Sequence, residues 1–272
     1  MNKYSKIAAN LTLLMTVFVI PDAFSMEPKK ILFAFVGDTG TSAYTGSLQG
    51  LSEANLQGQF LNLNYTLEVI DQKNAITTDY SNYIAIVSAA DKNTFNEIAI
   101  NNPDTAVFNI TLDNDELRQE CLPNALHIVP SNQMKVDAVN QWRKKVPETT
   151  ASAQAWHPDY VKFAARDLNK RYAKSHDTKM DDTAWAGWAA IKMSSDTVAR
   201  ENIAEAGKLL NYLKTELKFD GQKGIEMNFR ETGQLGQPLL LVENDEIVAE
   251  APVRGVAKPP SEDSLGVLNC PK

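Results

Sequence analysis

The first half of the chain alternates short apolar segments with stretches of helical periodicity, and this order constrains the fold more than any other feature. Ile31–Val36 is an uninterrupted apolar run, of the kind that is buried on both faces of a parallel sheet. Tyr65–Ile70 alternates apolar and polar residues, and further strands are expected at Tyr83–Val87, Thr105–Ile110 and Ala125–Val129. Strands that alternate with helices at this spacing predict an α/β fold with a doubly wound parallel sheet and right-handed crossovers.

The segments between these strands carry helix signals. A helix is expected from about Thr45 to Gln57, after the first strand. Asp91 is a suitable N-cap for a helix that ends near Asn101, and Ser131 caps a helix that runs to about residue 145. Together these strand–helix units predict one α/β region over residues 31–146.

The second half of the chain has a different pattern. Residues 147–154 form a linker rich in Pro, Thr, Ser and Ala, and helices are expected at about 159–174, 182–199 and 201–217. Asp181-Asp182-Thr183 supplies the cap of the second helix. Trp185 and Trp188 recur within it at helical spacing, which favours core packing over the alternative, a shelf on which a ligand stacks.

The end of the chain is predicted to be mostly β-structure. Residues 225–251 have the pattern of a β-hairpin with Asn244-Asp245 at a turn, and 256–272 read as an irregular tail. The predicted domain is a single lobe over residues 26–255, which contains the strand–helix units, the helices of 156–217 and this hairpin.

The N-terminus has the features of a secretory signal peptide. Lys3 and Lys6 precede the apolar run Leu11–Ile20, and Ala23-Phe24-Ser25 provides small residues at a cleavage site, so residues 1–25 are expected to be removed. The apolar run is short for a membrane anchor, although a retained anchor is the alternative. With 27 Lys+Arg against 34 Asp+Glu, the net charge of −7 argues against nucleic acid as a partner.

The chain has two cysteines, Cys121 and Cys270. In an exported protein they have a single intramolecular pairing open to them, and an oxidising compartment favours it. The bond would close a loop of about 150 residues, worth roughly 5 kcal/mol in the chain-entropy model, and would tie the tail to the lobe. Two free thiols are the alternative.

Three loops follow predicted strands and could form a binding site. They are Gly37–Tyr44, Ser88–Asp91 and Asn109–Asn114, and all are rich in hydroxyl, amide and small residues. In open parallel sheets, ligands bind beyond the carboxyl ends of the strands. Accessible backbone N–H groups and hydroxyls near helix N-termini suit a carboxylate or a phosphate. The loops therefore predict a site for a small polar molecule; the alternative is that they only cap helices.

The sequence lacks the signatures of an enzyme. GxSxG, HExxH and Walker A motifs are absent. Asp38-Thr39-Gly40 spells the triplet of aspartic proteases, but it occurs once and follows a strand of an α/β pattern. His127 is expected inside the fifth strand, His157 at a helix start and His176 on the surface, and their spacing does not suit a metal. We expect a non-catalytic protein without a cofactor.

Four parts of the chain carry a family resemblance. Ile31–Asp71 resembles the opening of type I periplasmic solute-binding proteins of branched-chain amino acid ABC transporters. More narrowly, the chain resembles the substrate-binding proteins encoded with PQQ-dependent alcohol dehydrogenase systems. Both cysteines fall where that subfamily tends to carry them. Three stretches carry this second resemblance. The first runs from Val107-Phe108-Asn109 to Pro130-Ser131 and includes Asp113-Asn114-Asp115-Glu116-Leu117-Arg118, Cys121-Leu122-Pro123-Asn124 and His127. The others are Trp156-His157-Pro158-Asp159-Tyr160 and Gly233-Gln234-Leu235 with Gln237-Pro238-Leu239-Leu240-Leu241-Val242.

The resemblance implies a periplasmic binding protein. Its ligand would be a small polar molecule such as an amino acid or a product of alcohol oxidation, and its partner an ABC permease or a periplasmic quinoprotein dehydrogenase. In the amino-acid binders, the second and third loops hold the α-carboxylate and α-ammonium groups. The matching ligand-binding residues here are Thr41, Ser42, Ala43, Tyr44, Ser88, Ala89, Ala90, Asn109 and Thr111.

One departure from the family affects the function. The linker Pro147–Gln154 leads almost directly to Trp156–Tyr160, whereas the family has a second lobe with its own parallel strands between the matching positions. We therefore expect essentially one lobe, with the C-terminal hairpin as a remnant of the other. A single lobe leaves a ligand half solvated, so the alternative function is an accessory protein that has lost the two-lobe clamp. Its exposed surface would favour a partner or a homodimer.

Overall fold

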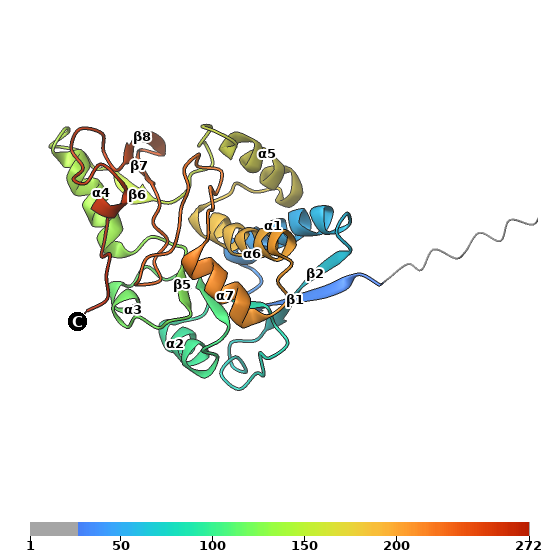
Figure 1. The fold of residues 1–272 in the computed structure, drawn as a ribbon. Coiled ribbons are helices and arrows are strands. Elements are labelled where there is room, and N and C mark those ends of the chain that lie inside the picture. Colours follow the sequence, from blue (N-terminus) through green and yellow to red (C-terminus); the bar gives the residue numbers. More distant parts are fainter. Residues whose placement is uncertain (1–26, 272) are drawn as a thin grey trace, which may run out of the picture.

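Five parallel strands form the main sheet in the computed structural model, which describes residues 27–271 (Figure 1). The strand order is β2-β1-β3-β4-β5, so the first strand lies inside the sheet and the order reverses beside it. All five predicted strands are confirmed. Their bounds are β1 Lys29–Val36, β2 Leu63–Ile70, β3 Ala85–Ser88, β4 Ala106–Asn109 and β5 Ala125–His127.

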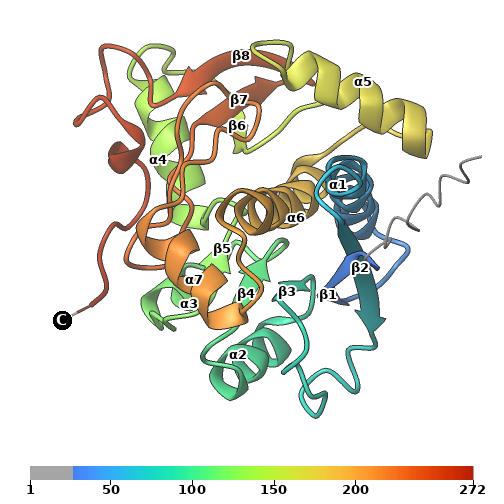
Figure 2. The same cartoon turned by 45° about the vertical axis from the view of Figure 1, so that its right-hand side comes forward.

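Each face of the main sheet is buried by helices. In β1, Phe33 and Phe35 belong to the apolar core on one face, whereas Ala34 and Val36 belong to the core on the other. Figure 2 shows α1 and α6 side by side over the first face, with α7 beside them, while α2 covers the second face. The predicted doubly wound α/β fold is confirmed. The helix bounds are α1 Ser42–Gly58, α2 Lys92–Asn101, α6 Asp182–Glu201 and α7 Ala206–Thr215.

Helices α1 and α6 approach each other closely through glycines. A Cβ atom at Gly46 would lie 1.9 Å from the carbonyl oxygen of Ala184, and one at Gly187 would lie 2.3 Å from that of Ala43. Only a residue without a side chain permits this distance between backbones. The contact fixes the N-terminus of α6 beside the start of α1. Trp185 and Trp188 of α6 are buried, which confirms that they pack in the core.

A second, smaller sheet contains three antiparallel strands in the order β6-β7-β8. The predicted hairpin is confirmed, and its turn residues Asn244 and Asp245 have φ angles of 52° and 63°, as a type I′ turn requires. Helix α4, capped by Ser131 as predicted, packs on this sheet around an apolar core of its own. The bounds are α4 Asn132–Arg143, β6 Ser152–Gln154, β7 Leu239–Glu243 and β8 Glu246–Ala251.

Two predictions for this region are wrong. The linker over 147–154 contains β6, because Ser152–Gln154 pairs with the edge of β7. The segment 225–229 is not a strand of the hairpin. It forms only isolated bridges, Phe219 with Met227 and Phe229 with Leu235, and so turns back on itself before the small sheet begins.

Several helix ends also differ from the predictions. Helix α5, Ala165–His176, begins later than the predicted start at Asp159. The amide of Asn169 donates to the carbonyls of His157 and Tyr160, which holds the preceding segment in an irregular turn. His157 therefore lies in this turn and not at a helix start. The start of α7 is likewise later than 201, because α6 continues to Glu201 and ends at the left-handed Asn202. A short helix, α3 Asp115–Gln119, and a 3₁₀ turn at Glu262–Ser264 were not predicted.

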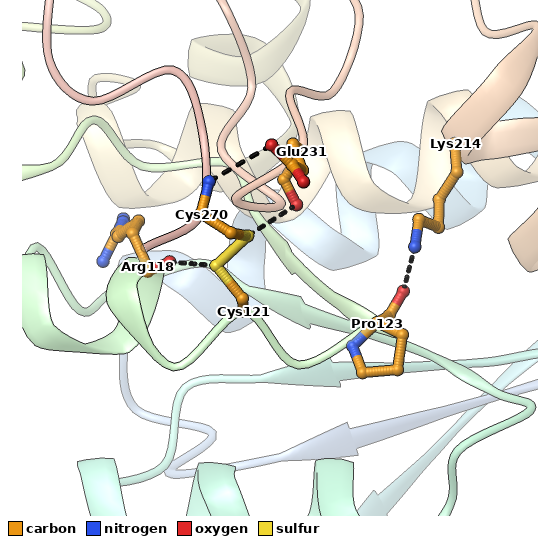
Figure 3. Close-up of a disulfide and its surroundings, with 6 residues drawn as sticks. All are labelled: Arg118, Cys121, Pro123, Lys214, Glu231 and Cys270. Atoms are coloured by element: carbon orange, nitrogen blue, oxygen red, sulfur yellow. Dashed lines mark hydrogen bonds between the residues drawn. A yellow bond between two sulfur atoms is a disulfide. The ribbon is translucent and has the colours of Figure 1, made fainter. Parts of the chain in front are cut away.

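A disulfide joins Cys121 to Cys270, as predicted, with Cα atoms 6.0 Å apart (Figure 3). The backbone N–H of Cys270 also donates to Glu231, at 3.2 Å. The tail has further attachments, since the guanidinium of Arg230 donates to the carbonyls of Glu262 and Leu265 at 2.6 and 2.7 Å. The disulfide is therefore one of several contacts that hold the last residues on the lobe.

The predicted signal peptide, residues 1–25, lies outside the described residues. From residue 27 to residue 271, no helix combines the length and the apolar character that a membrane crossing needs. Export and its alternative, a retained anchor, stay predictions.

Candidate functional site

The carboxyl ends of β1 and β3 lie at the point where the strand order reverses. The chain leaves β1 for α1 on one face and leaves β3 for α2 on the other. The N–H of Ala89 donates to the carbonyl of Val36 at 2.8 Å, and Gly37 lies against Ala89. Two of the predicted loops, Gly37–Tyr44 and Ser88–Asp91, are therefore neighbours at the position where open α/β sheets bind ligands.

Two hydroxyls of the first loop, those of Thr41 and Ser42, are already engaged. Thr41 caps α1 by accepting from the N–H of Tyr44 at 3.4 Å, and it donates to the carbonyl of Asp38 at 2.7 Å. Ser42 donates to Asp181 at 2.7 Å. Both serve the helix N-termini, and both remain half-buried at the edge of the loop.

The other two residues of this loop differ in exposure. Ala43 is buried against α6, so its side chain is enclosed by protein. Tyr44 is half-buried and packs edge-on against Phe35, with ring centroids 5.0 Å apart. Among these two, Tyr44 is the one whose side chain can reach a bound molecule.

The second loop turns most of its side chains inward. Ser88 and Ala90 are buried, and the hydroxyl of Ser88 accepts from the N–H of Ala90 at 3.4 Å. Ala89 is half-buried. Asp91 caps α2 as predicted, and the N–H of Thr94 lowers the pKa of its carboxyl. This loop can therefore offer mainly its backbone and Ala89 to a ligand.

The third loop is shaped by Asn109, which is fully buried. Its oxygen accepts from the N–H groups of Thr111 and Leu112 at 3.2 and 2.8 Å, and its nitrogen donates to the carbonyl of Leu112 at 2.7 Å. The same nitrogen lies 3.1 Å from Nδ1 of His127. Asn109 therefore forms the loop from behind. Thr111 is half-buried, and its hydroxyl has no partner in the part of the chain that the structure describes.

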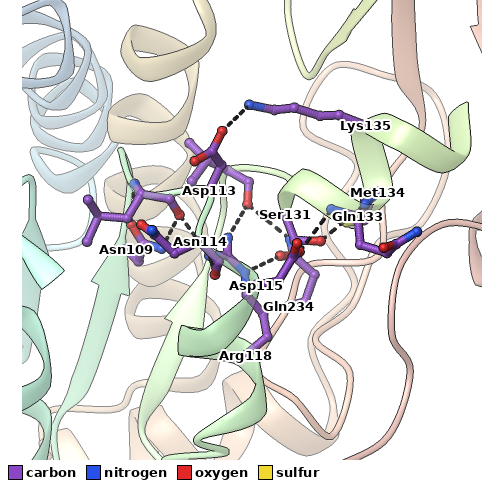
Figure 4. Close-up of polar contacts among 12 residues, drawn as sticks. Asn109, Asp113, Asn114, Asp115, Arg118, Ser131, Gln133, Met134, Lys135 and Gln234 are labelled. Carbon is purple, nitrogen blue, oxygen red and sulfur yellow. Dashed lines mark hydrogen bonds and ion pairs between the residues drawn. The ribbon is translucent and has the colours of Figure 1, made fainter. Parts of the chain in front are cut away.

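A buried arginine fixes the far side of this loop (Figure 4). Arg118 donates to the carbonyls of Leu112, Asn114 and Val129 and to the side chain of Gln234, at 2.8 to 2.9 Å. Burial lowers its pKa to about 10, so it stays protonated at neutral pH. Each of its three nitrogens thereby donates to a protein group, so Arg118 serves the structure of the loop.

His127 is a buried, neutral residue of β5. Burial, together with the charge of Arg118, keeps its pKa well below the usual range. Its Nε2 atom has no partner within residues 27–271. The prediction that His127 lies inside the fifth strand is confirmed, although one of its nitrogens is unsatisfied.

An ion pair connects the third loop to the small sheet. Lys135 of α4 extends to Asp113, with 2.9 Å between Nζ and Oδ2 (Figure 4). Burial alone would raise the pKa of Asp113, but Lys135 and Arg118 lower it below its usual value. The pair places one positive and one negative charge at the carboxyl edge of the main sheet, and both side chains remain partly exposed.

Asp182, at the start of α6, forms a second connection. Its carboxylate accepts from the N–H of Trp156 at 2.6 Å, and Trp156 stacks on Trp185 with 5.8 Å between centroids. Burial raises the pKa of Asp182, although the N–H groups of Trp156 and Ala155 oppose the shift.

Lys223 forms a third connection and is almost completely buried. It donates to Gln237 at 2.7 Å and to the carbonyl of Pro238 at 3.2 Å, and its ammonium lies 4.1 Å from the ring centroid of Trp185. Burial lowers its pKa to about 7. The ammonium thus joins α6 to the segment that leads into β7.

The structure brings the three predicted loops to one edge of the sheet but gives their residues unequal access. No pattern in the sequence pointed to Lys135 or Lys223, and Asp182 was recognised only as part of a helix cap.

Across residues 27–271, no cluster of side chains could hold a metal ion. Surface hollows of 120 to 560 Å³ lie elsewhere on residues 27–271, and the predicted residues line none of these. The half-buried residues are Thr41, Ser42, Tyr44, Ala89 and Thr111; the buried ones are Ala43, Ser88, Ala90 and Asn109.

Solved structures share this architecture. A branched-chain amino acid ABC transporter periplasmic ligand-binding protein from Burkholderia xenovorans superposes with a TM-score of 0.69 at 13% identity, over 81% of this chain and 95% of that one. An amino acid ABC transporter substrate-binding protein from Pseudomonas fluorescens gives 0.65 at 12% identity, over 90% and 96%. A leucine-binding protein from Thermotoga maritima gives 0.60 at 11% identity, over 82% and 98%.

No protein-family model matches the sequence, and no curated protein matches it either. Identities this low show a common fold without showing a common ligand. The chain has the fold of type I periplasmic binding proteins.

Proposed function

We propose that this protein is a periplasmic solute-binding protein of an ABC transporter system, and that it binds a small polar ligand such as an amino acid at the carboxyl edge of the main sheet. The observation that carries the proposal is the meeting of the first two loops at the reversal of strand order, between β1 and β3. Ligands of open α/β sheets bind at this position. Neighbours of the same fold are described as binding proteins for leucine and for branched-chain amino acids.

The charges at this edge suit a zwitterion. Lys135 can attract a carboxylate, while Asp113 and the exposed Asp181 can attract an ammonium group. The half-buried Thr41, Tyr44 and Thr111 lie on loops at the same edge. Lys135 and Asp113 are only partly exposed. Water therefore screens their attraction for a bound amino acid less than it would screen fully exposed charges.

The ligand and partner classes follow from the sequence resemblance. A PQQ-dependent alcohol dehydrogenase system would supply a product of alcohol oxidation as ligand. An ABC permease or the periplasmic quinoprotein dehydrogenase itself would be the partner. A carboxylic acid formed by alcohol oxidation has the same charged group as an amino acid, so Lys135 would attract it in the same way.

A second candidate function is supported by the small sheet. It has three strands against five in the main sheet. The contacts of Asp182 with Trp156, and of Lys223 with Gln237, join the two sheets through buried polar groups. Such groups resist separation because each would lose its partner. A protein that does not open and close would act as an accessory partner and not as a clamp.

Thermal unfolding in the presence of single ligands tests the proposal. Amino acids, PQQ and carboxylic acids are added singly to the wild type and to Lys135→Met, with Lys170→Met as the matched control. A ligand at one hundred times its Kd should stabilise the wild type by about 2.7 kcal/mol. We expect this shift in the control and a smaller one in Lys135→Met.

The same experiment separates the two candidates. If no compound raises the melting temperature and the protein captures a dehydrogenase or a permease, the accessory function is supported. A ligand that stabilises all three proteins equally would place its site away from Lys135 and contradict the proposed edge.

A further inference from the structure

The last strand of the small sheet lies beside a groove. β8 has β7 on one side and no strand on the other, as far as residues 27–271 extend. A groove of about 490 Å³ is lined by β8 with its turn, Asp245–Glu250, and by the irregular segment Asp159–Lys162. The groove thus runs along β8 and is bordered by the unpaired edge of that strand.

The backbone of this edge is available. Outside the β7–β8 ladder, no N–H or C=O group of Glu246–Glu250 makes a hydrogen bond to any described residue. Alternate residues of an edge strand direct these groups away from their own sheet. Such a row of donors and acceptors can pair with an extended peptide.

Two exposed apolar side chains line the groove. Val161 and Val248 are 61% and 39% exposed. Both can contact the apolar residues of a bound strand.

The charges of the groove are mostly negative. Lys162 pairs with Glu250 at 2.8 Å, and His157 lies 3.2 Å from Asp245. Asp159 and Glu246 are exposed, and neither has an ion-pair partner in the part of the molecule described. The groove therefore has two carboxylates to offer a cationic occupant.

A second copy of the chain does not fit these charges. β8 contains Glu246 and Glu250 but no Lys or Arg, so a second β8 strand would bring no cation to the carboxylates of the groove.

We propose that the groove binds an extended segment of a partner protein that carries basic side chains at alternate positions. The segment adds to β8 as a fourth strand of the small sheet. Its basic side chains lie near Asp159 and Glu246, and its apolar side chains contact Val161 and Val248. The groove shares no residue with the predicted ligand loops, so this inference does not depend on ligand binding there.

A peptide of alternating Lys and Val, about six residues long and blocked at both ends, is the probe. The control peptide replaces each Lys by Glu. Fluorescence anisotropy of labelled peptide measures the affinity, and hydrogen exchange of the backbone amides locates the site. We expect the Lys-Val peptide to bind and to slow exchange at Ile247–Glu250, and the Glu-Val peptide to do neither.

Paired variants make the test specific to the groove. Asp159→Lys with Glu246→Lys alters two exposed side chains and should weaken binding by about tenfold or more. Glu97→Lys with Glu148→Lys makes the same charge change at exposed positions elsewhere and should bind like the wild type. The proposal is overturned if the Lys-Val peptide does not bind, if both peptides bind equally, if the groove variant keeps full affinity, or if exchange slows at another surface.

Discussion

Lys135 and Asp113 form an ion pair of 2.9 Å that joins the helix of the small sheet to the loop after β4 of the main sheet. The two side chains come from different structural layers, and each is partly exposed. The ion pair therefore forms only while the two sheets keep their relative position at the carboxyl edge of the main sheet, where we propose that the ligand binds.

Replacing Lys135 by Met should raise the pKa of Asp113, because the ammonium that stabilises its charged form is removed. The effect on the free energy of unfolding should be small, at most about 1 kcal/mol, since water screens a partly exposed pair. NMR titration of the Asp113 carboxyl measures the first effect and urea unfolding the second. An unchanged pKa of Asp113 would mean that the pair does not form in solution.

Lys223 should make stability depend on pH. Its pKa is about 7 in the folded protein against 10.5 for the free side chain, so between these values the unfolded chain binds more protons. The free energy of unfolding should therefore rise from about pH 7 to about pH 10, and the penalty of the buried charge should be full below that range. In Lys223→Met this rise should disappear. Lys145→Met, at an exposed position, should keep it, and urea unfolding at several pH values compares the three proteins.

Removing the disulfide, with Cys121→Ser and Cys270→Ser together, should lower the free energy of unfolding by about 2–5 kcal/mol. The bond closes a long loop, with a sequence separation of 149 between its cysteines, and so restricts the unfolded chain. Denaturant unfolding measures the loss. As an independent check, a reducing agent should destabilise the wild type to a similar extent and leave the double variant unchanged. Equal stability of the two proteins would show that the other contacts of the tail suffice.

Gly187→Ala should destabilise the protein by about 1–3 kcal/mol, because a methyl group there would overlap the backbone of α1. Its Cβ would lie 2.3 Å from the carbonyl of Ala43 and 2.7 Å from the hydroxyl of Ser47. Gly207→Ala is the matched control: it is also a helical glycine, but its nearest neighbour is at 3.7 Å. The control should be neutral or gain up to about 1 kcal/mol from helix propensity. Thermal unfolding distinguishes the two, and equal effects would exclude tight packing of α1 on α6.

The main sheet could be predicted because its signals are local. The apolar run of β1 is buried on both faces, and Asp91 and Ser131 cap helices with their own side chains. Apolar runs and helix caps depend on residues that are close together in the sequence, so the sequence alone reveals them. β6 could not be predicted in this way, since three residues carry too short a pattern and their partner strand begins at Leu239.

The candidate site was predictable in position but not in detail. The order of strands and loops placed Thr41 and Ala89 at one edge of the sheet. Asn109 has the polar side chain expected of a ligand-binding residue, yet its hydrogen bonds shape its own loop and bind His127. Lys223 acquires its environment from Trp185 and Gln237, which only the folded chain brings to it. Burial and partners of this kind depend on tertiary packing, which the sequence pattern does not contain.

The contact between β5 and the segment near Gln234 has a consequence for biosynthesis. His127 and the residues around Gln234 exchange backbone hydrogen bonds, at 2.8 and 2.9 Å, as two adjacent strands would. One edge of β5 therefore stays unpaired until Gln234 has been synthesised, 107 residues after His127. A nascent chain that ends before Gly233 would expose this unpaired edge of β5. We therefore expect chaperones to retain nascent chains that are stalled before Gly233.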